Sequence, residues 1–166
     1  LQLEDDFIFD FEITPNRGDC FSHLGVAREL SIIEDKDIIK KMTKLKSSNF
    51  KTSNLIKINI KDKLICNRYA CRVIKNIQVS DSPQWLKNKL ISIGQKPINN
   101  IVDIANYIMF DLGQPLHIFD YNKIKGKQII VRLARKNEKI KCLDDISRTL
   151  DNNDIVIADS ENPIAI

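Results

Sequence analysis

The sequence predicts an α+β fold, in which a mixed, sandwich-like sheet of short strands carries inserted helices and follows a strand, a turn and a helix. Several short stretches alternate apolar and polar residues, as half-buried strands do. Other stretches repeat apolar residues at helical spacing and begin with residues that cap helices. Short strands mixed with a few helices, without a regular alternation of the two, favour the α+β class.

The chain opens with a predicted strand over 5–14, a turn, and a predicted helix over 20–33. Four apolar side chains share one face of that strand: Phe7, Phe9, Phe11 and Ile13. Asp19 is suited to cap the helix, and the proline and glycine of the turn are explained by backbone geometry. We therefore interpret this turn as structural, while leaving open whether Arg17 faces a partner.

A polar connector and two further strands come next. Residues 34–54 are rich in lysine and serine and show no periodicity, which indicates a connector. Alternating patterns predict strands over 55–60 and 67–79. A helix is predicted over 82–94, because Ser82 can cap its first turn and a proline follows directly.

A further helix is predicted to end at Leu112. Asn99 or Asn100 can cap its start, and Gly113 can adopt the left-handed conformation that ends a helix. Asp103 lies near the start, where the helix dipole favours an anion. The apolar residues at helical spacing are Ile101, Ile104, Ala105, Ile108 and Leu112.

The C-terminal part reads as strands and tight turns. Strands are predicted over 128–133, 139–143 and 154–158, and the last is a continuous apolar run typical of a buried strand. A hairpin turn is predicted at 136–137, before the second of these strands, and another turn at 144–145.

Composition limits the classes of protein that the chain can belong to. Its 43% hydrophobic and 29% charged residues are typical of a globular protein and argue against disorder. No apolar run reaches membrane-spanning length and no secretory signal opens the chain, so we expect a cytoplasmic protein without membrane contact. The net charge of +4 permits an anionic partner such as RNA, but the scattered lysines favour a solvated surface. Because Ile166 falls within a strand-like run, we expect a segment of a longer protein.

The cysteines show no spacing typical of a metal site. Cys20, Cys66, Cys71 and Cys142 form no CxxC pair and have no neighbouring histidine pair. We therefore expect reduced thiols and neither a zinc site nor a disulfide framework.

His117 follows the glycine–proline break after the predicted helix. On pattern alone, such a histidine is more often structural than catalytic. The surrounding sequence VDIANYIMFDLGQPLHIFD carries more information. Together with FEITPNRGDCFSHLGVAREL, CNRYACRVI, SPQWLKNKL, IVRLARKNEKIKCLDD and DIVIADSENPIAI, in this order, it resembles the family of bacterial phenylalanyl-tRNA synthetase beta subunits.

The resemblance covers essentially the whole chain and implies its domain organisation. Residues 1–38 correspond to the C-terminal part of a small helical, B1-like domain, and 39–54 to a linker. Residues 55–166 correspond to a B3/B4-like editing domain that lacks its C-terminal end. The family's glycine-rich segment and editing glutamate would then follow Ile166.

In this family the B3/B4 module hydrolyses tyrosine wrongly attached to phenylalanine tRNA. The resemblance assigns His117 to the editing site, where it would position the tRNA terminus or the attacking water, and general-base action is a further role. It assigns Lys96, Ala105 and Asn106 to substrate binding. Lys96 stands where the family usually has arginine, and Ala105 where it usually has threonine, so the resemblance leaves open a weakened pocket that serves as scaffold and tRNA-facing surface.

The resemblance also implies partners. These are the alpha subunit, in an alpha2-beta2 tetramer, and the tRNA for phenylalanine. The resemblance places ATP and magnesium elsewhere in the full enzyme, mainly on the alpha subunit. This segment has no glycine-rich phosphate loop, which is consistent with that placement, and no cofactor or metal is expected here. Without the resemblance, an unrelated small binding module with a structural His117 would fit the pattern.

Overall fold

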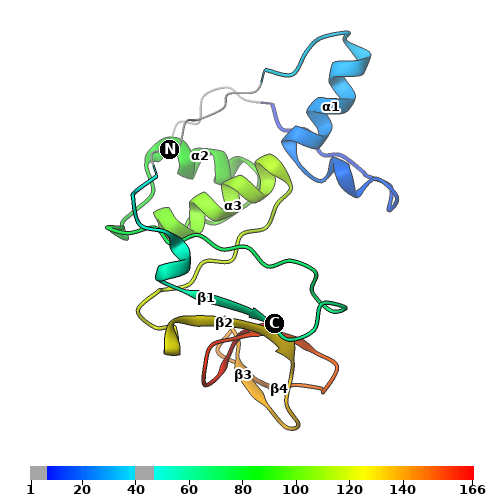
Figure 1. Cartoon of the computed structure of the whole chain (residues 1–166). Helices are drawn as coiled ribbons and strands as arrows, with labels where there is room; N and C mark the ends of the chain where they lie inside the picture. The colour runs from blue at the N-terminus through cyan, green and yellow to red at the C-terminus, as the bar shows by residue number, and fades with distance from the viewer. Residues whose placement is uncertain (1–6, 40–46) are drawn as a thin grey trace. The chain divides into compact units, whose positions relative to one another are not determined.

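A computed structural model describes residues 7–39 and 47–166 of the chain (Figure 1). The described residues combine α-helices with a mixed sheet, which confirms the predicted α+β class. They divide into two units. The α-helices belong to the first, formed by residues 7–39 with Ile77–Ile118, and the strands belong to the second, formed by residues 47–76 with Phe119–Ile166.

The second unit contains a four-stranded sheet and a separate two-stranded hairpin. The sheet has the order β1-β2-β5-β6, in which β1 and β2 run parallel and the other neighbours run antiparallel. Its strands are β1 (Lys57–Ile60), β2 (Gln128–Leu133), β5 (Ile155–Ala158) and β6 (Pro163–Ala165). The hairpin joins β3 (Lys139–Lys141) to β4 (Ser147–Thr149) through the predicted turn at 144–145.

Both faces of the sheet are covered, which explains the continuous apolar run in β5. Val156 and Ala158 lie in a cluster with residues of the hairpin. Ile157, which points to the other face, packs on a second cluster built around Ile129. The predicted turn at 136–137 forms, but β3 pairs with β4 instead of β2, so this turn does not close a hairpin.

The first unit contains α1 (His23–Ile33), α2 (Gln84–Ser92) and α3 (Asn100–Leu112). α3 contacts both of the other helices (Figure 1). Within 7–39 and 47–166, no helix is long and apolar enough to cross a membrane.

Several predicted local features are wrong. Residues 7–14 and 67–79 form no strand, although both show apolar alternation. A strand requires a neighbour to pair with its backbone, and both described sheets are built from other segments. Of the predicted connector over 34–54, residues 40–46 lie outside the described residues, and Thr52–Asn54 form a short 3-10 helix.

The predicted caps of two helices are also wrong. Asp19 lies in a separate 3-10 turn, Gly18–Cys20, and the N-cap of α1 is Ser22, whose hydroxyl accepts from the backbone N–H of Gly25 at 3.0 Å. Ser82 does not cap α2, because Pro83 occupies the N-cap position. The Ser82 side chain makes a tertiary contact instead, described below.

Candidate functional site

The four residues predicted to form a site lie on α3 and the segments on either side of it. Lys96 precedes the helix, Ala105 and Asn106 lie within it, and His117 follows it. All four belong to the first unit. The geometry of the two ends of α3 therefore determines how these side chains are presented.

The start of α3 is fixed by side-chain hydrogen bonds. The Asn99 amide oxygen accepts from the backbone N–H groups of Ile101 and Val102, at 3.0 and 3.1 Å. This confirms Asn99 as the cap, the first of the two predicted alternatives. Asn100 instead ties the helix to the preceding chain, because its backbone N–H donates to the Ser80 carbonyl at 2.9 Å and its amide binds the same residue.

Asp103 is fully buried and joins three parts of the unit. Its Oδ2 accepts from the Ser82 hydroxyl at 2.5 Å, and its Oδ1 accepts from the backbone N–H of Ile98 at 2.8 Å. The carboxylate therefore connects α3 to the segments before α2 and before α3 itself. The sequence predicts Asp103 at the helix start, where the dipole favours an anion. The structure shows in addition that the side chain is buried and makes these two hydrogen bonds.

The end of α3 follows the prediction. Gly113 has φ of 74° and caps the helix through a bond from its N–H to the Met109 carbonyl at 2.8 Å. A Cβ at this position would lie 3.2 Å from the Ser22 side chain, so the chain passes close to the start of α1 as it leaves α3. His117 follows in an exposed segment without regular secondary structure.

The predicted residues differ in how far they reach solvent. Lys96 and His117 are exposed, Asn106 is half-buried, and Ala105 is buried. Tyr107 beside Asn106 meets Trp85 of α2 edge-on, with ring centroids 5.7 Å apart. The predicted apolar face is only partly buried, since Ile104 and Leu112 are 49% and 45% exposed.

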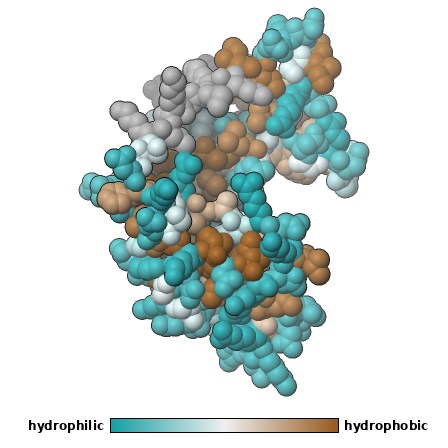
Figure 2. Space-filling model, in the orientation of Figure 1, coloured by the Kyte–Doolittle hydropathy of each residue, from teal (hydrophilic) through white to brown (hydrophobic). Residues whose placement is uncertain are grey.

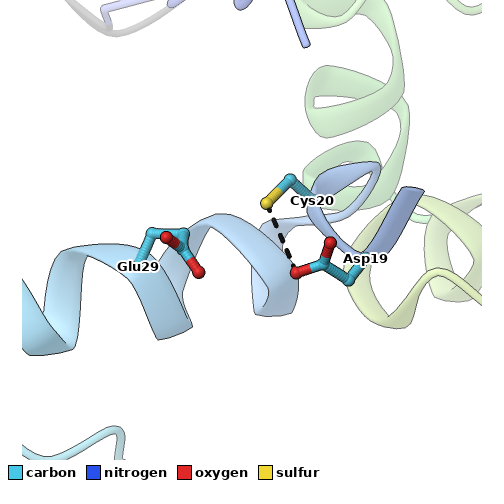
Figure 3. Close-up of side chains that lie close together, drawn as sticks. All are labelled: Asp19, Cys20 and Glu29. Atoms are coloured by element: carbon cyan, nitrogen blue, oxygen red, sulfur yellow. Dashed lines mark hydrogen bonds between the residues drawn. The ribbon is translucent and has the colours of Figure 1, made fainter. Parts of the chain in front are cut away.

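A second cluster lies around the start of α1, and no sequence pattern predicts it. The Asp19 and Glu29 carboxylates and the Cys20 thiol place their potential ligand atoms within 4.8 Å of one another (Figure 3). Arg17 already lies among them, because its Nη2 donates to Glu29 at 2.6 Å, to Asp19 at 3.0 Å and to the Cys20 sulfur at 3.2 Å. A guanidinium therefore supplies the positive charge that a metal ion would bring.

The titration of these groups agrees with an ion-pair network. The hydrogen bond from Arg17 lowers the pKa of Asp19 to about 2. Burial raises the pKa of the Cys20 thiol, which disfavours the reactive thiolate. The predicted structural role of this turn fits these contacts, and Arg17 is engaged within its own unit.

An apolar cavity of about 320 Å³ adjoins this network. It lies between the segment before the turn and α1, and most of its wall is apolar, with side chains that include Phe11, Val26, Leu30 and Ile33. Apolar side chains also reach the surface over α1 (Figure 2), where Ile32 and Ile33 are 77% and 75% exposed. None of the four predicted residues of the α3 site lines this cavity.

Comparison with known proteins extends the sequence resemblance. Residues 65–166 match the B3/4 domain family. A phenylalanine–tRNA ligase beta subunit of Fusobacterium nucleatum subsp. nucleatum is 47% identical over 161 residues, which cover 97% of this chain and 20% of that protein. The corresponding subunit of Protochlamydia amoebophila is 45% identical over 164 residues, 99% of this chain and 20% of that protein.

A less similar relative aligns with the whole chain. The phenylalanine–tRNA ligase beta subunit of Bacillus cereus is 39% identical over 166 residues, 100% of this chain and 20% of that protein. The chain thus spans about a fifth of the length of the curated relatives it matches.

Proposed function

Because this chain belongs to the B3/4 domain family and matches phenylalanine–tRNA ligase beta subunits along nearly all of its length, we propose that it is a segment of such a subunit. We further propose that it carries part of a site that hydrolyses tyrosine wrongly esterified to the tRNA for phenylalanine. The observation that supports this most is the position of His117, exposed directly beyond the capped end of α3.

The physical reason for such a site is the similarity of the two amino acids. A pocket shaped for phenylalanine rejects an analogue with one additional hydroxyl only weakly. A second pocket that hydrogen-bonds the hydroxyl discriminates better, because phenylalanine would leave its polar groups unpaired. Hydrolysis then requires an oriented water and stabilisation of the developing oxyanion.

The environments of the proposed site residues suggest different roles. His117 is exposed, so it can reach a tRNA terminus or a water. The half-buried Asn106 amide can donate to or accept from a substrate. Lys96 is exposed and can supply charge to a phosphate, while the buried Ala105 can contribute only apolar surface.

The alternative is a subunit whose editing pocket is weak and whose segment acts as scaffold and tRNA-facing surface. Lys96 lacks the planar fork that an arginine would offer at this position, and Ala105 offers no hydroxyl. Measuring hydrolysis of tyrosyl-tRNA by the wild-type full-length subunit separates the two proposals, because the alternative predicts little hydrolysis above the spontaneous rate.

His117→Ala in the full-length subunit tests the proposed role of this residue. We expect it to slow tyrosyl-tRNA hydrolysis by roughly a hundredfold, the scale of a lost acid–base or positioning group. His23→Ala is the matched control, since the His23 side chain is 64% exposed on α1 and has no proposed contact with substrate. An unchanged rate in the His117 variant, or equal losses in both variants, would reject the proposal.

The remaining parts of the proposal concern the whole protein. The subunit would act in the cytoplasm with an alpha subunit in an alpha2-beta2 tetramer, bind the tRNA for phenylalanine, and support charging with ATP and magnesium bound outside this segment. Residues 1–166 alone should neither activate phenylalanine nor hydrolyse tyrosyl-tRNA. Turnover of either kind by the purified segment would contradict this prediction.

A further inference from the structure

We propose that Asp103 is a positioning residue, whose buried carboxylate holds the Lys96 segment and the Asn106 turn of α3 in one fixed arrangement. The predicted effect of Asp103 on catalysis rests on the proposed function. Its structural part can be tested without that function. Neither Asp103 nor its partner Ser82 is among the residues that the sequence resemblance assigned to the site.

The Lys96 segment is short and is held at both ends. At its start, Gly94 has φ of 75° and donates to the Ile91 carbonyl, and Gln95 donates to the Leu90 carbonyl, each at 2.9 Å. These two bonds form the Schellman arrangement that closes α2. At its end, the backbone N–H of Ile98 donates to Asp103. Only the short stretch around Lys96 remains between the two anchors.

Proline restricts that stretch further. Pro97 has a fixed φ and disfavours a helical conformation in the residue before it, which is Lys96. The backbone of Lys96 is therefore constrained from both sides, although its side chain is exposed. Loss of the Asp103 bond would release the end of the segment that α2 does not hold.

The same carboxylate fixes the first half of α3. Asp103 and Asn106 are three positions apart, so they lie on adjacent turns of one helix face. The Ser82 hydroxyl holds Asp103 from the segment that precedes α2. One side chain thus sets the positions of a charged residue and an amide residue proposed to contact the same substrate.

A buried carboxylate at position 103 would destabilise the fold if it served packing alone. The Asp103 side chain is completely buried, and the bonds described to it come from one hydroxyl and one backbone N–H. Burial of a carboxylate is unfavourable unless its bonds are well made. The geometry is accounted for if those bonds hold the Lys96 segment in the orientation that the site uses.

Two variants of the full-length subunit test the proposal with two measurements. Asp103→Ala removes both bonds, whereas Asp103→Asn keeps an oxygen for the Ile98 N–H and an amide for Ser82. We expect Asp103→Ala to speed hydrogen exchange at the Ile98 amide and to lower kcat for tyrosyl-tRNA hydrolysis by roughly tenfold or more, because a displaced positioning group costs about this much. Asp103→Asn should recover most of both losses.

Leu86→Ala controls for lost stability, and Ser82→Ala provides a milder change. Leu86 is 1% exposed in α2, and its side chain makes no hydrogen bond. Leu86→Ala should lower kcat less than Asp103→Ala does, because it removes no hydrogen bond to the Lys96 segment. Ser82→Ala should have an intermediate effect and should add little once Asp103 is already alanine. This variant tests the contact even if Asp103→Ala does not fold.

The outcomes separate the two proposals. If exchange at Ile98 is unchanged in Asp103→Ala, or if Leu86→Ala lowers kcat equally, the positioning role is wrong. A second outcome is that wild type does not hydrolyse tyrosyl-tRNA while hydrogen exchange at Ile98 still responds to Asp103→Ala. The proposed function would then be wrong, and so would the predicted effect of Asp103 on kcat. The structural contact between Asp103 and Ile98 would still be confirmed.

Discussion

Replacing Glu138 with glutamine should destabilise the second unit, because it removes the charge of an ion pair that is largely shielded from water. Arg132 donates to both carboxylate oxygens of Glu138 at 2.7 Å, and the two side chains are 11% and 10% exposed. Glu138 also accepts from the backbone N–H of Arg135 at 2.8 Å. The substitution keeps the shape of the side chain but leaves the Arg132 charge without its counterion.

The size of the effect follows from the titration of the carboxyl group. The hydrogen bonds from Arg132 lower the pKa of Glu138 from 4.5 to about 2. One pKa unit corresponds to roughly 1.4 kcal/mol, so this shift corresponds to about 3 kcal/mol of unfolding free energy. Because both side chains are slightly exposed, we expect a loss of about 2 to 3 kcal/mol. The pKa of Glu138 is lower in the folded than in the unfolded chain. This stabilisation is therefore complete above pH 4.5 and is lost as the pH falls toward 2.

Urea denaturation of the wild-type chain and of Glu138→Gln at several pH values measures this contribution. The difference in unfolding free energy should be largest near neutral pH and should shrink below about pH 4.5. Asp144→Asn is the matched control, because Arg148 binds Asp144 with the same two-bond geometry while both side chains are nearly half exposed. A difference that does not depend on pH, or an equal loss in the exposed pair, would refute this reasoning.

Two pairs of glycine substitutions, each a test and its control, probe the backbone of the first unit. Gly25→Ala should unfold the start of α1, because the added Cβ would lie 1.9 Å from the Asp19 carbonyl oxygen. Gly18→Ala is the control and should be tolerated, because its added Cβ would meet no atom. Limited proteolysis and far-UV circular dichroism compare the two variants. Gly113→Ala should cost about 1 to 2 kcal/mol of unfolding free energy from its left-handed conformation, plus a further loss from the 3.2 Å contact with the serine that caps α1. Gly94→Ala has nearly the same φ without that contact, so an equal loss in denaturation of both variants would show that the contact contributes nothing.

α3 shows which features can be predicted from sequence. Its Asn99 cap, one of the two predicted alternatives, and its predicted Gly113 end are confirmed, because both depend on bonds within a few residues of the helix end. The strand at 154–158 was predicted for a similar reason, since a run that is buried on both faces is apolar throughout.

The incorrect predictions involve contacts between distant segments. The alternation around Phe9 predicts a strand, but alternation does not supply the neighbouring backbone that a strand pairs with. Ser82 before a proline predicts a cap, whereas the tertiary partner of this hydroxyl is 21 residues away in α3. An acidic residue within an apolar helix was the available signal for that pair, but it does not identify the partner.

The residues of the candidate site are predicted by motif resemblance alone, whereas physical chemistry explains how the segments that carry them are held. His117 and Asn106 carry no pattern that distinguishes a site from a structural residue. The caps and the buried carboxylate explain how their segments are held. The network around Arg17 depends on a contact with Glu29, 12 residues further along the chain and within α1, so spacing alone does not predict it.

We propose that the end of α3 presents part of a site for an aminoacyl ester. A structure of the full-length subunit bound to an amide-linked, non-hydrolysable tyrosyl-adenosine analogue tests it most directly. We predict that the ribose end of the analogue lies within hydrogen-bond distance of His117 and that Asn106 lines the same pocket. Binding of the analogue at a surface away from both side chains would contradict the claim.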